Sequence, residues 1–127
     1  MSDFPIVVDA VREPVTLYRA CHGEDSDSLR AAMRSNYEAG RRAHPAERRA
    51  IVMHMAVSMF EDGERLQSFA RRRPDRLGTH VARIELRPGV GICRADTGSV
   101  GHWSVWGLPD QLADCVVDVI PIDPEVL

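Results

Sequence analysis

The chain has 127 residues, of which 44% are hydrophobic and 28% charged, and its formal net charge is -3. These values are typical of one soluble globular domain, large enough to bury a core without disulfides or metals. They argue against a strongly basic partner-binding field, and no run approaches the roughly 18 apolar residues that a membrane span needs.

We expect residues 1–127 to form a single domain, with residues 1–13 as a lead-in and 123–127 as a tail. The N-terminus lacks the pattern of a signal peptide. The cysteines are odd in number and show no CxxC spacing: Cys21, Cys93 and Cys115. This favours reduced thiols over a disulfide framework, and with it a cytoplasmic location.

Apolar spacing and turn residues predict the secondary structure in chain order. The first part should contain a strand at 14–21, with room for a short strand at 6–8 before it, then a helix over 27–40 and a helix beginning at Pro45. The middle should contain a strand at 56–60 and a helix over 64–73. The last part should contain strands at 79–88, 90–96, 102–107 and 116–122, with a short helix or turn at 109–115.

This order of elements is typical of an α+β domain. We expect a curved, mainly antiparallel sheet, whole or split in two, with about three helices beside it. Eight apolar residues have the spacing of core positions: Leu17, Phe60, Phe69, Ile84, Leu86, Ile92, Val117 and Val119.

Two polar side chains interrupt predicted strands. Arg19 lies within VTLYRAC, where an arginine is costly to bury unless it is paired or faces a cleft. It either reaches solvent from an edge strand or holds a carboxylate or phosphate with its planar fork of donors. Ser58 lies within HMAVSMF and either bonds to the nearby backbone or lines a pocket.

The segment GHWSVWG at 101–107 holds both tryptophans of the chain. In a strand, alternation puts His102, Ser104 and Trp106 on one face and Trp103 on the other. One face would then offer a ring nitrogen, a hydroxyl and a flat aromatic surface, as a site lining does. The alternative is that the tryptophan on the other face is core and the polar residues are exposed.

Several chemistries lack their motifs. The five histidines form no HExxH or finger pattern, so no metal is expected. All sixteen basic residues are arginine, which excludes a lysine-containing phosphate loop. The arginine-rich stretches RRAHPAERR and FARRRPDR are interleaved with acidic residues, so nucleic acid is not expected as a partner.

The strand with LYR at 17–19, the strand with VSMF at 57–60, the helix after it and the final run of strands resemble the layout of ADP-ribosyltransferase-like toxins and enzymes of the arginine–serine–glutamate type. The layout is also similar to that of NAD-consuming RES-domain toxins. The resemblance implies that Arg19 holds the phosphates of NAD and that Ser58 orders the nicotinamide pocket. The family's third motif, a glutamate at the start of a late strand, has no counterpart, and Asp110 is the nearest carboxylate.

The resemblance implies an ADP-ribosyltransferase or NAD glycohydrolase of the kind found among toxins, with NAD as substrate. His102 would join Arg19 and Ser58 in catalysis. The cofactor contacts would come from Tyr18, Arg19, Ser104, Trp106 and Asp110. The missing glutamate leaves a second function open, a non-catalytic module that binds a nucleotide or a protein partner through the same cleft.

Overall fold

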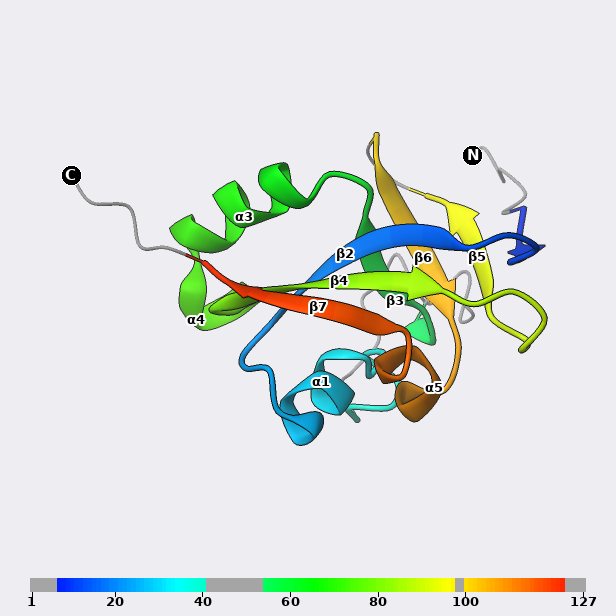
Figure 1. The fold of residues 1–127 in the computed structure, drawn as a ribbon, viewed down its shortest axis with the longest axis horizontal. Coiled ribbons are helices and arrows are strands. Elements are labelled where there is room, and N and C mark those ends of the chain that lie inside the picture. The colour runs from blue at the N-terminus through cyan, green and yellow to red at the C-terminus, as the bar shows by residue number, and fades with distance from the viewer. Residues whose placement is uncertain (1–6, 41–53, 98–99, 123–127) are drawn as a thin grey trace.

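The computed structural model describes residues 7–40, 54–97 and 100–122 (Figure 1). Within these ranges the strands are β1 (Asp9–Ala10), β2 (Val15–Cys21), β3 (Val57–Phe60), β4 (His80–Leu86), β5 (Cys93–Asp96), β6 (His102–Trp106) and β7 (Val116–Pro121). The helices are α1 (Ser26–Ala32), α3 (Gly63–Arg72), the single turn α4 (Pro74–Leu77) and α5 (Pro109–Ala113). The predicted α+β class is confirmed.

The described strands form one open sheet in the order β1-β5-β6-β3-β2-β4-β7, with neighbouring strands antiparallel. The two halves of this sheet meet between β2 and β3, where the one paired position is Tyr18 opposite Phe60. By contrast, β2 and β4 are in register along the whole length of both strands, from Val15 opposite Leu86 to Cys21 opposite His80. The sheet is therefore continuous, but its two halves are joined by only a short stretch of strand pairing between β2 and β3.

Helices cover both faces of the sheet (Figure 1). Helices α1 and α5 pack together on one face, and α3 lies across the other. Most of the core lies on the α1/α5 face, where Leu17, Ile84, Leu86 and Ile92 are buried as predicted. Met33, from the end of α1, is also fully buried there.

Part of the predicted core is wrong. Phe69 is 44% exposed and Val117 is 51% exposed, and Phe60 is half-buried, whereas the half-buried Val119 packs against the core. The side of α3 that faces the sheet carries Leu66 and Ala70, and these two residues are buried in place of Phe69. Val117 lies on β7, which is the last strand of the sheet and has a neighbour on one side only.

Several elements differ from the sequence-based expectation, among them the strand expected at 90–96, which begins at Cys93. Helix α1 ends at Ala32 and not near Gly40, and the chain continues in turns. The early strand is at 9–10, where it pairs with β5, so part of the expected lead-in belongs to the sheet. A helical turn, α4, stands where a loop was expected. The helix expected from Pro45, up to residue 53, and the tail at 123–127 lie outside the described residues.

A tight turn follows α4 and leads into β4. Gly78 has a φ of 140°, and a Cβ atom built there would lie 2.3 Å from the backbone oxygen of Cys21. The next amide, that of Thr79, donates to the same Cys21 oxygen. This approach of two backbone segments is possible because glycine has no side chain.

None of the helices in the described ranges has both the length and the apolar character that a membrane span needs.

Candidate functional site

Arg19 lies on the face covered by α1 and joins the two halves of the sheet. Its Nη1 donates to the backbone oxygen of Ser58 at 2.7 Å, and its Nε donates to the backbone oxygen of Ala32 at the end of α1. The strand pairing between β2 and β3 is short, so the guanidinium supplies a donor to β3 that the β2 backbone does not. This accounts physically for an arginine within an apolar strand.

The side chain of Ser58 lies on the opposite face from that of Arg19. In β3 the buried Val57 and Met59 point toward the α1/α5 core, whereas Ser58 is exposed and Phe60 is half-buried. Ser58 pairs with Ser104 across the strands. The two residues that the family resemblance would bring to one ligand are therefore separated by the sheet, and their side chains do not line a common cleft.

The serine face carries a polar cluster next to β6. The Nδ1 atom of His102 lies 2.7 Å from the backbone oxygen of Thr97, which can only accept, so Nδ1 carries the hydrogen. The Thr97 and Ser104 hydroxyls share a hydrogen bond of 2.7 Å. With Nδ1 used in this way, the Nε2 atom of a neutral His102 is left as an acceptor. His102 also packs edge-on against Phe60, with ring centroids 5.2 Å apart.

The other predicted contact residues are distributed around the molecule. Tyr18 lies beneath the first turn of α3, where a Cβ atom at Gly63 would come within 2.9 Å of its ring. Asp110 is exposed on α5, on the face opposite Ser58, and forms an ion pair with Arg30 at 3.5 Å. Asp110 is therefore separated from Ser58 and His102 by the sheet, whereas Tyr18 lies on their face, opposite Phe60.

The two tryptophans have separate surroundings. Trp106 lies four residues from His102 along β6, or about 13 Å at strand spacing. It lines a different hollow, whose lining includes Tyr37 and Glu38 and no arginine among the described residues. Trp103 is half-buried, its Nε1 donates to Glu61 at 2.6 Å, and the Arg94 guanidinium stacks 4.1 Å from its ring centroid. A single site that contains His102 and Trp106 is therefore not formed.

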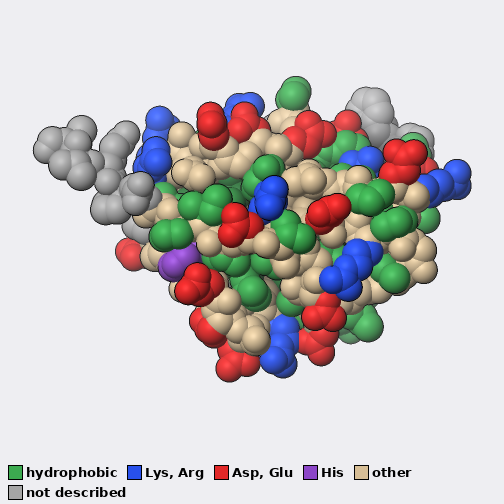
Figure 2. Space-filling view, in the orientation of Figure 1, with side chains coloured by type: hydrophobic (Ala, Val, Ile, Leu, Met, Phe, Trp, Pro, Cys, Tyr) green, Lys and Arg blue, Asp and Glu red, His purple; other side chains and the backbone are tan. Residues whose placement is uncertain are grey.

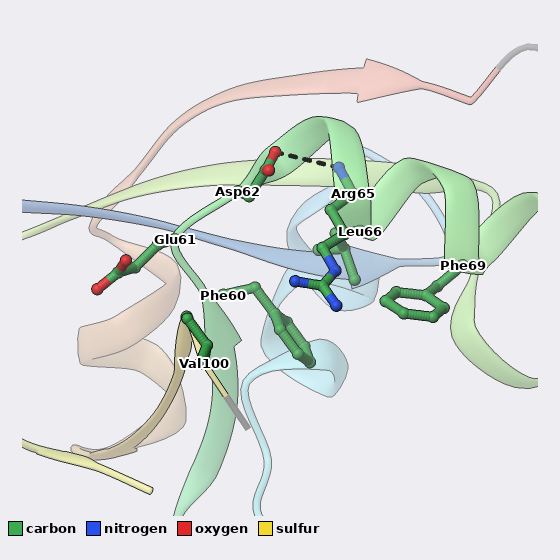
Figure 3. Close-up of a pocket in the computed structure, with 8 residues that line it drawn as sticks. Phe60, Glu61, Asp62, Arg65, Leu66, Phe69 and Val100 are labelled. Carbon is green, nitrogen blue, oxygen red and sulfur yellow. Dashed lines mark hydrogen bonds between the residues drawn. The ribbon is translucent and has the colours of Figure 1, made fainter. Parts of the chain in front are cut away.

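A cavity of about 250 Å³ lies between α3 and the turn before β6, on the same face as Ser58 and His102 (Figure 3). Its lining is Phe60, Glu61, Asp62, Arg65, Leu66, Phe69, Val100 and Gly101. Figure 3 shows the Arg65 guanidinium between the rings of Phe60 and Phe69. Its carbon lies 5.9 Å from the Phe69 centroid. Two aromatic rings and a cation thus meet in one hollow.

The two carboxylates at this cavity are engaged in bonds within the protein. Asp62 is the N-cap of α3 and accepts from the amides of Glu64 and Arg65, each at 3.1 Å. Glu61 accepts the Trp103 indole hydrogen, and in Figure 3 its carboxylate points away from the rings. Within the described ranges no carboxylate lies within ion-pair distance of the Arg65 guanidinium. Hydrogen bonds from neutral donors leave both carboxylates charged, so the lining carries two negative charges and one positive charge, and the guanidinium is the charged group that lies between the rings.

Metal and thiol chemistry receive no support at this cavity. Among the described residues, no group of three or more His, Cys, Asp and Glu side chains could hold a metal ion. The thiols of Cys21 and Cys115 are buried, and that of Cys93 is half-buried on β5. Burial raises the pKa of the Cys21 thiol, so the nucleophilic thiolate is disfavoured there.

Sequence reasoning missed the two residues that shape the cavity, Arg65 and Phe69. The apolar spacing places both on an ordinary amphipathic helix, with Phe69 on its buried side. The available signal was the four-residue spacing of an arginine and an aromatic residue on one side of a helix. Comparison of the chain with protein-family models, curated proteins and solved structures finds no match.

Proposed function

We propose that this chain is a nucleotide-binding protein whose site is the cavity beside α3. The observation that carries the proposal is the Arg65 guanidinium, which stands between the rings of Phe60 and Phe69 without a carboxylate partner in the described ranges. Phenyl rings stack on flat heterocycles, and a guanidinium binds phosphate through two parallel hydrogen bonds. NAD is the first nucleotide to test, because the sequence layout resembles that of NAD-using enzymes.

The size of the cavity supports a base, and not a whole dinucleotide, as the enclosed part of the ligand. Its volume of about 250 Å³ is below the roughly 300–1,000 Å³ that encloses a drug-sized ligand. A single heteroaromatic ring would stack on Phe60 within the cavity, because the Arg65 guanidinium already lies between Phe60 and Phe69. The phosphates would lie at the exposed mouth of the cavity, where Arg65 is.

Binding is favoured over cleavage of NAD. Cleavage of the nicotinamide–ribose bond develops positive charge on the sugar, which a nearby carboxylate stabilises. Glu61 and Asp62 are held by Trp103 and by the α3 amides, so neither is directed into the cavity. His102 provides the observation that keeps cleavage as a second candidate, since its Nε2 could accept a proton from an attacking water.

Calorimetric titration of the protein with NAD, ADP-ribose, AMP and nicotinamide tests the proposal. We expect phosphate-bearing ligands to bind and Arg65→Ala to weaken them about ten- to a hundredfold, as removal of a charge-assisted bond does. Arg34→Ala, an exposed arginine beyond α1, is the matched control and should leave affinity unchanged. No heat from any nucleotide at millimolar concentration would exclude the proposed function.

The same samples separate binding from cleavage. Chromatography of the NAD mixture over several hours should show no released nicotinamide. Release that disappears in His102→Gln, with binding retained, would establish the enzyme in place of the binding module.

A further inference from the structure

The exposed side of α3 carries an aromatic residue between two arginines. Arg65, Phe69 and Arg72 are spaced by four and three residues, so they form one line along the helix. All three side chains are exposed. We call this line the α3 stripe. It begins at the mouth of the cavity and continues toward the end of the helix.

The acidic residues that neighbour the α3 stripe in sequence are directed elsewhere in space. The Glu61 carboxylate bonds to Trp103, and the Asp62 carboxylate is occupied by the first amides of α3. Glu64 lies about 100° around the helix from Arg65, on a separate line of residues. The acidic residues at the start of α3 therefore lie off the line of the stripe, whereas the exposed Asp75 of α4 follows three residues after Arg72.

Arg71 and Arg73 lie beside the far end of the stripe and are exposed. Figure 2 shows basic side chains gathered where α3 ends, although acidic and basic groups alternate over most of the visible face. A protein with a net charge of -3 thus concentrates positive charge on one helix.

The length of the stripe exceeds what one nucleotide can contact. Arg65 and Arg72 are separated by about 10 Å along the axis, at a rise of about 1.5 Å per residue. A base enclosed in the cavity would place its own phosphate at Arg65, so any phosphate that contacts Arg72 would be a further one. Single-stranded nucleic acid repeats a phosphate and a flat base, and alternating cations and aromatic rings are the surface that binds it.

We propose that the α3 stripe binds a single-stranded oligonucleotide, with one terminal base in the cavity and the next base stacked on Phe69. Arg65 and Arg72 contact successive parts of the phosphate backbone. The inference rests on the proposed function, because the cavity supplies the first base position. RNA and DNA share this chemistry, so both are tested.

Fluorescence anisotropy of labelled oligo(U), oligo(dT) and a DNA duplex of equal length tests the inference. We expect both single strands to bind, and Arg72→Glu to weaken them at least tenfold. Because this variant no longer neutralises its phosphate, the slope of log affinity against log salt should also fall by about 0.7. Arg34→Glu is the matched control, since it makes the same charge change at an exposed position just after α1 and not on α3, and it should change affinity less than twofold. Thermal melting confirms that both variants are folded.

Three results would overturn the inference. These are equal weakening by Arg72→Glu and Arg34→Glu, duplex binding as tight as single-strand binding, and no oligonucleotide binding at low salt. Titration of the same variants with AMP, which has one phosphate and one base, keeps the two proposals apart. Arg72→Glu should retain AMP binding, so AMP binding without oligonucleotide binding ends only the inference. Oligonucleotide binding that depends on Arg72, without any mononucleotide binding, would support oligonucleotide binding at the α3 stripe and refute nucleotide binding in the cavity.

Discussion

Replacement of Arg19 by methionine distinguishes a structural arginine from a ligand-binding one. The variant keeps most of the side-chain volume and removes the donors to the backbone oxygens of Ala32 and Ser58. A hydrogen bond from a charged donor contributes about 1.5–3 kcal/mol, and the half-buried position lies toward the lower value for each bond. We therefore expect Arg19→Met to lower the free energy of unfolding by about 2–4 kcal/mol.

The assay is urea denaturation followed by tryptophan fluorescence, with the slope against urea unchanged so that the midpoint reports stability. Arg87→Met is the matched control, because Arg87 is an exposed arginine that also donates to a backbone oxygen, that of Asp114, at 2.7 Å. It should cost less than about 1 kcal/mol. If Arg19→Met is as stable as the wild type while nucleotide affinity falls tenfold, the role in phosphate binding implied by the family resemblance is correct and our reasoning is refuted.

Three further predictions concern stability and are measured by urea or thermal denaturation. Leu66→Ala should cost about 2–5 kcal/mol because the side chain is buried, whereas Phe69→Ala should cost less than about 1 kcal/mol, and equal costs would contradict the assigned faces of α3. Gly78→Ala should abolish or strongly reduce stability because its Cβ would overlap a backbone oxygen, and a neutral effect would contradict the close approach of this turn to Cys21. The hydroxyl and amide of Ser28 hold the pKa of Asp25 below its usual value, so this carboxylate stabilises α1 above about pH 4 and the contribution disappears as the pH falls through the folded pKa. Asp25→Asn should therefore be less stable than the wild type at neutral pH and approach it in acid, and a constant difference across pH would exclude this linkage.

The fold class could be predicted from local patterns because alternation and turn residues are properties of short segments. The ends of β2 and β6 agree with the predicted ends to within about a residue for that reason. The pattern fails where a residue serves a tertiary contact. Met33 continues the apolar spacing of α1, yet it is buried at the point where the helix has ended, and the polar Ser35 is buried just after it.

The candidate site was less predictable, because it depends on which face each side chain takes across several strands. Ser58 and His102 were expected on one side and lie there. Arg19 belongs to the other side, since the register of β2 with β4 puts it with Ala82 and the core. No local pattern reports the register between strands that are distant in sequence. The cavity could not be predicted for the same reason, because it forms only where α3 lies beside the turn before β6.

The short pairing of β2 with β3 and its full-length pairing with β4 also affect the order of folding. β2 is an interior strand of the sheet, and its full-length partner β4 comes only after β3 and α3 in the chain. Pairing over such separations carries a large loop-closure entropy, which slows folding relative to helical proteins of the same size. During synthesis the pairing of β2 with β4 cannot form until residues 80–86 have left the ribosome. Until then the unpaired edge of β2 can form non-native pairs with other strands. The contacts of Arg19 with β3 and α1 are native interactions that β2 can form before β4 has been synthesised.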